Sequence, residues 1–253
     1  MSILQSIRVW LTGSEARTQM SRGGFECPVS LTGRIHNLNL VLREYQAADE
    51  QQWLRVRADN AHWLRPWDSC DPDYAAAPQF SEWVQVNRED ELNGNSVVWG
   101  IFIGDELVGE ISIGAIQYGP IRQGIVGYWV AQGWAGHDIA PAALGLVSDW
   151  ALSAPAGPHL HRVEVDIVPA NSRSLRVAQK AGFSEEGLRR GFMYVNGQWR
   201  DHLCFALLAT DPVAHEGVLN HVQFETLQAD GRESVRLRER REYALRECCE
   251  RMR

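Results

Sequence analysis

Hydrophobic and polar positions in the first part of the chain predict one strand followed by two helices. Residues 38–45 alternate between apolar and polar side chains, as a half-buried strand does. Residues 47–64 instead carry apolar side chains at helical spacing. A second helix is expected over residues 80–94, with Ser81 as its N-terminal cap and Gly94 as its end.

The hydrophobic period then changes to two, which predicts an antiparallel meander. Three strand-like runs cover residues 96–104, 106–116 and 123–131, and a tight turn at Gly104-Asp105 joins the first two. The pattern next predicts a helix, a strand, a helix and a hairpin that turns at Asn196-Gly197, over residues 139–152, 161–171, 172–183 and 192–209. The order β α α β β β α β α β β predicts a mixed α/β domain over residues 37–212.

The two ends of the chain lack this organisation. Residues 1–36 show no sustained period, so we expect an N-terminal arm or an extra hairpin there. Residues 213–253 end in a run of Arg and Glu, several of them four apart, which predicts an exposed, charged helical extension. Such a helix would be exposed to solvent or would dock a partner. The alternative is a contact between its basic residues and nucleic acid.

Charge and composition exclude several classes of protein. A net charge of −7 and a pI near 5.6 argue against general nucleic-acid binding. No apolar run is long enough to span a membrane. The five cysteines lack metal-ligand spacing, as do His159, His161, His202 and Asp201, so we expect no metal. Free thiols indicate a reducing, cytoplasmic compartment.

Residues 127–146 (GYWVAQGWAGHDIAPAALGL) predict a strand, a turn of small residues and a helix. The strand ends at Val130, and the helix begins near Ala140. Amide groups at the start of a helix bind anions such as a pyrophosphate, and small side chains leave that backbone accessible. Tight packing is the alternative reason for Gly133 and Gly136.

Three other segments resemble one family, in the right order along the chain. They are HWLRPWD (62–68), VPANSRSLRVAQKAGF (168–183), which holds Asn171 and Ser174, and GLRRGFMYVNGQWRDHLCFALLATD (187–211). With the turn before Ala140, they resemble the GNAT superfamily of acetyl-CoA-dependent N-acetyltransferases, in particular its RimJ/RimL-type branch. The resemblance covers residues 37–212 and implies a mostly antiparallel sheet, flanked by helices, whose two central strands splay apart to admit the pantetheine arm.

The resemblance also implies the reaction. It is transfer of an acetyl group from acetyl-CoA to an amine by direct attack in a ternary complex. The implied acceptor is the N-terminal amine of a protein, such as a ribosomal protein. A membrane, a general nucleic-acid partner and a metal are not implied, and the oligomeric state is left open.

In this family a loop of pattern Q/R-x-x-G-x-G/A holds the pyrophosphate of acetyl-CoA. The register places Ala135, Asp138 and Ala140 at the three specified positions, and only Ala140 matches. The resemblance thus gives a cofactor-binding set made of Val130, Gly136, His137, Asp138, Ile139, Ala140, Asn171 and Ser174.

Asp138 is the residue of this set that conflicts with an anion. Aspartate tolerates left-handed backbone angles, but a carboxylate about 5 Å from a pyrophosphate repels it by about 3 kcal/mol. Either Asp138 turns outward to cap the helix, or it weakens acetyl-CoA binding, with His137 or nearby arginines offsetting part of the charge. If binding is lost, the chain is a non-catalytic binding module, which is the alternative function.

Acetyl transfer needs a base for the amine and an acid for the departing thiolate. The resemblance gives Ser174 the acid role and Asn171 the role of orienting cofactor or substrate; a plain helix cap is the alternative for Ser174. Glu164 and Asp166 lie two residues apart on one strand and so share a face. If that face meets the cleft, either is a candidate base, and Glu110 is the second choice.

Aromatic residues are candidates for the acceptor pocket. Trp63 and Trp67 lie near the substrate-side helices and are expected to wall it, together with Trp83. Tyr128, just before the end of the central strand, is placed to hydrogen-bond the substrate. Packing in the core is the alternative for each of these rings.

Overall fold

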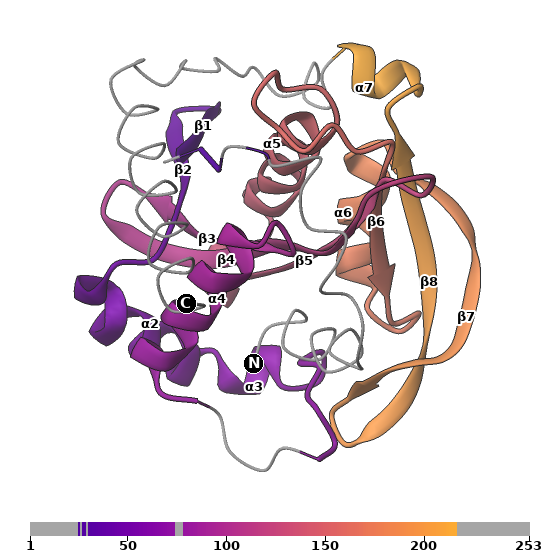
Figure 1. Ribbon diagram of the computed structural model, residues 1–253. Coiled ribbons are helices and arrows are strands. Elements are labelled where there is room, and N and C mark those ends of the chain that lie inside the picture. Colours follow the sequence, from indigo (N-terminus) through magenta and orange to yellow (C-terminus); the bar gives the residue numbers. More distant parts are fainter. Residues whose placement is uncertain (1–24, 26, 29, 74–77, 217–253) are drawn as a thin grey trace, which may run out of the picture.

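The computed structural model describes residues 25, 27–28, 30–73 and 78–216 of the chain (Figure 1). Its elements, in chain order, are β1 (Ser30–Ile35), β2 (Leu38–Arg43), η2 (Ala47–Asp49), α2 (Glu50–Asp59), α3 (Ala61–Leu64), α4 (Phe80–Leu92), β3 (Val97–Ile103), β4 (Glu106–Gln117), β5 (Gln123–Val130), η3 (Gln132–Trp134), α5 (Ile139–Leu152), β6 (Arg162–Ile167), α6 (Ser172–Lys180), β7 (Ser184–Val195), β8 (Gln198–Leu208) and α7 (Pro212–Glu216). From residue 38 to residue 208 the predicted order is confirmed, except that the first predicted helix is divided into α2 and α3 at Asn60.

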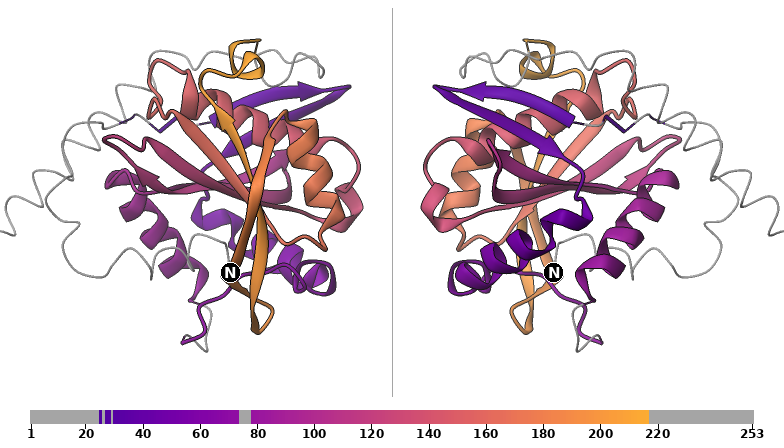
Figure 2. Two further views of the ribbon diagram at one scale, coloured as in Figure 1. Left: turned by 90° about the vertical axis from the view of Figure 1, so that its right-hand side faces the viewer. Right: turned by 90° about the vertical axis from the view of Figure 1, so that its left-hand side faces the viewer.

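The eight strands form one mixed sheet in the order β1-β2-β3-β4-β5-β6-β8-β7. Neighbouring strands are antiparallel except for β5 and β6, which are parallel. Helices α2 to α4 cover one face of the sheet, and α5 and α6 cover the other (Figure 2). The predicted mostly antiparallel α/β fold with flanking helices is therefore confirmed.

The two parallel strands separate along their length. Register pairs join β5 to β6 at Gln123–Arg162, Gly124–Val163 and Ile125–Glu164. Beyond Ile125, β5 continues beside β4 to Val130, while β6 continues beside β8 to Ile167. The sheet thus opens in its middle, as the predicted splay requires.

Helix α5 is fixed by its nearly complete burial. Its apolar residues, among them Leu144 and Val147 with no exposed surface, pack into the main core, where full burial of such a side chain stabilises by about 1.5–3 kcal/mol. A smaller cluster on the opposite face holds Trp83, whose ring lies 5.2 Å from that of Tyr45 and 5.9 Å from that of Phe80. Trp83 is therefore a core residue, and its prediction as a pocket wall is wrong.

The structure corrects the sequence-based expectations at two further places. Ser30–Ile35, which we assigned to the arm, forms β1 and pairs with β2, so this part follows the hairpin alternative. Ser81 is not a cap: α4 begins at Phe80, and the N–H of the preceding Gln79 donates to Glu82 at 3.4 Å. The rest of the arm and the charged extension from residue 217 lie outside the described residues, so the domain boundaries stay predictions. Within the described ranges, none of the helices has the length and apolar character that crossing a membrane needs.

Gly109 allows β4 and β5 to approach closely beside the opening of the sheet. A Cβ atom there would lie 2.3 Å from the carbonyl oxygen of Trp129 and 3.1 Å from Cα of Val130. Because backbone atoms cannot swing aside, we expect Gly109→Ala to lower the free energy of unfolding by about 1–3 kcal/mol, measured by urea denaturation. Gly133→Ala is the control, since a Cβ at Gly133 meets nothing within 4 Å; equal losses in the two variants would contradict the explanation.

Candidate active site

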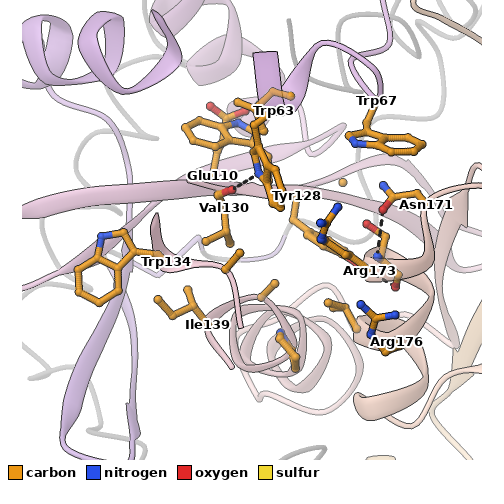
Figure 3. Close-up of a pocket in the computed structure, with 18 of the residues that line it drawn as sticks. Trp63, Trp67, Glu110, Tyr128, Val130, Trp134, Ile139, Asn171, Arg173 and Arg176 are labelled. Atoms are coloured by element: carbon orange, nitrogen blue, oxygen red, sulfur yellow. Dashed lines mark hydrogen bonds between the residues drawn. The ribbon is translucent and has the colours of Figure 1, made fainter. Parts of the chain in front are cut away.

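A cleft of about 540 Å³ opens where β5 and β6 separate. Strands β4 and β5 contribute its floor, α3 and the following loop one side, and the start of α5 with one face of α6 the other (Figure 3). Of the residues predicted from the sequence, the cleft is lined by Trp63, Trp67, Glu110, Tyr128, Val130, Gly136, Asp138, Ile139, Ala140, Asn171 and Ser174.

Backbone groups of β5 face the gap between the strands. Ala131 N–H donates to the Val108 carbonyl of β4 at 2.8 Å. Because backbone groups alternate in direction along a strand, Tyr128 and Val130 turn theirs away from β4 and towards the gap. The indole Nε1 of Trp63 indeed donates to the Val130 carbonyl from the other side, at 3.1 Å (Figure 3). A ligand that carries amide groups can therefore pair with β5 where β6 does not.

The turn before α5 and the first residues of this helix line the same cleft. Gly136 and Asp138 have positive φ angles of 86° and 61°, and α5 begins at Ile139. The prediction that Asp138 tolerates a left-handed conformation is confirmed. The first amides of a helix have no partners within the helix, and its dipole adds partial positive charge. Because Ala140 adds only a methyl group, this end of the cleft fits an anion.

The carboxylate of Asp138 makes an ion pair along one side of the cleft, between the start of α5 and α6. Its Oδ1 accepts from Nζ of Lys180 at 2.6 Å, and its Oδ2 lies 3.7 Å from Nε2 of His36. It makes no capping bond to α5, so the outward-cap alternative is wrong. His137, predicted to bind cofactor, is exposed, and its ring lies 5.8 Å from that of Trp134. Lys180, rather than His137, offsets the negative charge.

The start of α6 places Ser174 beside Tyr128 of β5. Asn171 caps the helix, since its Oδ1 accepts from the Ser174 N–H at 3.2 Å (Figure 3). The alternative that Ser174 is itself the cap is therefore wrong. The Tyr128 hydroxyl donates to the Ser174 carbonyl at 3.4 Å. Burial raises the pKa of Tyr128, so this hydroxyl keeps its proton at neutral pH.

Three cations of α6 also line the cleft, and the sequence analysis missed them. Arg173, Arg176 and Lys180 are three and four positions apart, which places them on one face of the helix. Figure 3 shows Arg173 and Arg176 on the side of α6 that borders the cavity. The guanidinium of Arg173 lies 4.5 Å from the ring centre of Trp63. The spacing within SRSLRVAQK was the available signal for this basic face.

Glu110 is a buried carboxylate of the cleft. It lies on β4 and is 3% exposed. Its Oε2 accepts from the Tyr45 hydroxyl at 3.1 Å and from the Trp53 Nε1 at 3.4 Å. Burial raises the pKa of Glu110, which brings it closer to the range that suits proton transfer near neutral pH.

Glu164 and Asp166 share a face of β6, as predicted, but both are held in ion pairs. Glu164 accepts from Nε of Arg162 at 2.6 Å and from Arg189 at 2.7 Å. Asp166 accepts from Arg189 at 3.1 Å, and burial raises its pKa to about 6. The structure does not bring Glu164 to the cleft. Asp166 borders a smaller adjoining cavity of about 70 Å³.

The same two carboxylates lie near the Cys204 thiol. Possible metal-ligand atoms of Glu164, Asp166 and Cys204 are within 4.8 Å of one another. A metal ion would have to compete with the two guanidinium groups that already bind these carboxylates. We therefore interpret the cluster as an ion-pair network that ties β6 to β7.

The sequence matches known acetyltransferases over most of its described part. The model of a family described as acetyltransferase (GNAT) domain matches residues 39–184. The ribosomal protein uS5-alanine N-acetyltransferase of Escherichia coli is 27% identical over 70% of this chain and 92% of its own. RimJ of Mycobacterium smegmatis, solved with CoA-disulfide, has 30% identity and a TM-score of 0.68, covering 76% of this chain and 94% of its own. RimL, a ribosomal α-N-protein acetyltransferase solved with coenzyme A, has 25% identity and a TM-score of 0.57, covering 72% and 96%.

Proposed function

Since the chain belongs to the GNAT acetyltransferase family and is an N-acetyltransferase, we propose that it transfers the acetyl group of acetyl-CoA to the N-terminal amine of a ribosomal protein. The main support for this proposal is the cleft between the splayed strands, because it joins an anion site at α5 to a buried carboxylate on β4. The relatives are named as enzymes, which gives no support to the non-catalytic module. A ribosomal acceptor would place the reaction in the cytoplasm.

The residues of the cleft fit acetyl-CoA along its length. Phosphates would meet the amides of Ile139 and Ala140 and the cations of α6. The amides of the pantetheine arm would pair with the outward backbone groups of Tyr128 and Val130. The thioester would then lie beside the hydroxyl groups of Tyr128 and Ser174.

The chain supplies the proton transfers of the reaction. Glu110 accepts the amine proton while the amine nitrogen forms a bond to the acetyl carbon and the bond from that carbon to sulfur breaks. The Ser174 hydroxyl donates to the departing thiolate, and Asn171 positions Ser174 through the helix cap. Trp63 and Trp67 wall the end of the cleft where the acceptor enters.

Acetyl-CoA and a peptide acceptor test this proposal directly. Acetyl-CoA at a hundred times its Kd should raise the free energy of unfolding by about 2.7 kcal/mol, because it binds the folded state only. Mass spectrometry should then locate one acetyl group on the α-amine of peptides that begin with alanine or serine. The same peptides with a blocked α-amine and an internal lysine are the control. Acetylation of that lysine would overturn the acceptor, and no stabilisation at millimolar acetyl-CoA would favour the binding module.

A further inference from the structure

Asp138 and Lys180 form a charged pair at the anion-binding end of the cleft. Both side chains line the cleft, and Nζ of Lys180 lies 2.6 Å from Oδ1 of Asp138. The two residues are 42 positions apart in sequence and come from different elements, the N-terminal end of α5 and the last turn of α6. A contact between two elements that border one cleft fixes both charges relative to it.

A carboxylate without a cationic partner would repel an anionic ligand at this position. The amides at the start of α5 and the cations Arg173 and Arg176 all favour an anionic ligand. A lone carboxylate about 5 Å from a phosphate would weaken its binding about a hundredfold at the effective dielectric of a protein surface. Asp138 makes no capping bond that would explain its place. Its observed partner is Lys180, with His36 at 3.7 Å on the other oxygen.

The ion pair between Asp138 and Lys180 restricts the motion of the lysine side chain. The Lys180 side chain is 48% exposed, and a flexible lysine stem loses conformational entropy whenever its ammonium is held at one point. The bond to Asp138 holds Nζ at the cleft before any ligand arrives. An ammonium has three N–H donors, and Asp138 takes one of them. The other donors are available to a phosphate oxygen.

We propose that Lys180 binds a phosphate of acetyl-CoA and that Asp138 is the residue that positions it. This inference rests on the proposed use of acetyl-CoA as acetyl donor. In this arrangement the carboxylate is tolerated only because the ammonium lies between it and the ligand's charge. The contribution of Asp138 to binding therefore depends on the presence of Lys180.

A double-mutant cycle on CoA affinity tests the dependence. Calorimetric Kd values for CoA are compared for the wild type, Asp138→Asn, Lys180→Met and the double variant; asparagine keeps the left-handed backbone. We expect Lys180→Met to weaken binding about a hundredfold, since it removes the cation and leaves the carboxylate unpaired. We expect Asp138→Asn alone to change the Kd less than about fivefold, because lost positioning and lost repulsion oppose each other. In the Lys180→Met protein the same substitution should tighten binding about tenfold or more, since only repulsion is left to remove.

Two further variants separate this role from a general effect of charge. Arg176→Met removes a neighbouring cation of α6, and Asp138→Asn should have the same small effect with or without it. Lys180→Arg keeps the charge and should recover most of the affinity that Lys180→Met loses. Denaturation curves of all variants exclude unfolding as the cause, since a half-exposed ion pair contributes little to stability.

The outcomes distinguish this inference from the proposed function. If the wild type binds CoA and the effects of Asp138→Asn and Lys180→Met simply add, the pair has no joint role and the inference fails while the function stands. If Asp138→Asn weakens binding in both backgrounds, Asp138 does not act through Lys180, and the inference again fails. If the wild type does not bind CoA, the proposed function itself fails.

Discussion

Replacing Glu110 by glutamine is expected to lower kcat for acetyl transfer by about 10²- to 10⁴-fold, the usual contribution of a general base. Glutamine has nearly the same shape and can still accept from Tyr45 and Trp53, but it cannot take the amine proton. Because Glu110 is proposed to act in the chemical step, the KM for acetyl-CoA should change little. Steady-state kinetics with a peptide acceptor measures both quantities.

The dependence of activity on pH identifies the base more sharply than the rate alone. Burial raises the pKa of Glu110, so activity of the wild type should rise as the pH rises through that raised pKa, and the rise should be absent from Glu110→Gln. The raised pKa also means that this group favours the folded state at low pH and loses that contribution as the pH rises. Glu110→Gln should therefore be no less stable than the wild type at neutral pH, which rules out unfolding as the cause of lost activity.

Glu164→Gln is the matched control for Glu110→Gln. Glu164 is also a buried glutamate, but its oxygens bind Arg162 and Arg189 and it does not line the cleft. We expect this variant to lose stability and to keep the rise of activity with pH. If Glu164→Gln abolishes that rise and Glu110→Gln keeps it, the base is the residue on β6, and our assignment of Glu110 is wrong.

Replacing Arg189 by methionine is expected to lower the free energy of unfolding by about 3–5 kcal/mol, the cost of leaving a buried charge without its partner. Arg189 bonds to both Glu164 and Asp166, whose side chains are 3% and 0% exposed. Methionine fills similar volume without supplying charge. Urea denaturation measures the loss, and Arg190→Met is the control, because Arg190 is the exposed neighbour on the same strand.

The loss of stability caused by Arg189→Met should increase as the pH rises. In the wild type burial raises the pKa of Asp166 from its ordinary value of 3.8 to about 6. Its contribution to stability is therefore fully present below pH 4 and is lost as the pH rises through 6. Without Arg189 the Asp166 carboxyl is harder still to ionise, so the loss of stability should be larger at pH 8 than at pH 5. A loss that is equal at both pH values would mean that packing, not charge, sets the effect.

Local signals in the sequence were enough to predict most of the fold. The change from helical to alternating spacing marks the meander, and Asn196-Gly197 marks the last hairpin, where both residues have the positive φ angles that such a turn needs. The cap of α4 was mispredicted because serine is a common cap residue, whereas here Glu82 satisfies the backbone of Gln79. Such errors shift an element's end without changing the architecture.

The chemistry of the site was harder to predict because it depends on partners far apart in sequence. Glu110 is 65 residues from Tyr45, and Asp138 is 42 residues from Lys180. Alternation correctly placed Glu164 and Asp166 on one face of β6, but only the position of Arg189 on β7 decides what that face meets. A carboxylate on a central strand looks the same in sequence whether it faces a substrate or a guanidinium.

The short junction between β5 and β6 has a consequence for turnover. Only three register pairs join the part of the sheet that holds β1 to β5 to the part that holds β6 to β8. A pantetheine arm lying in the opening would add contacts between these two parts of the sheet. The bound acetyl donor would then hold the two parts of the sheet together. Each release of free CoA would remove that connection before the next catalytic cycle.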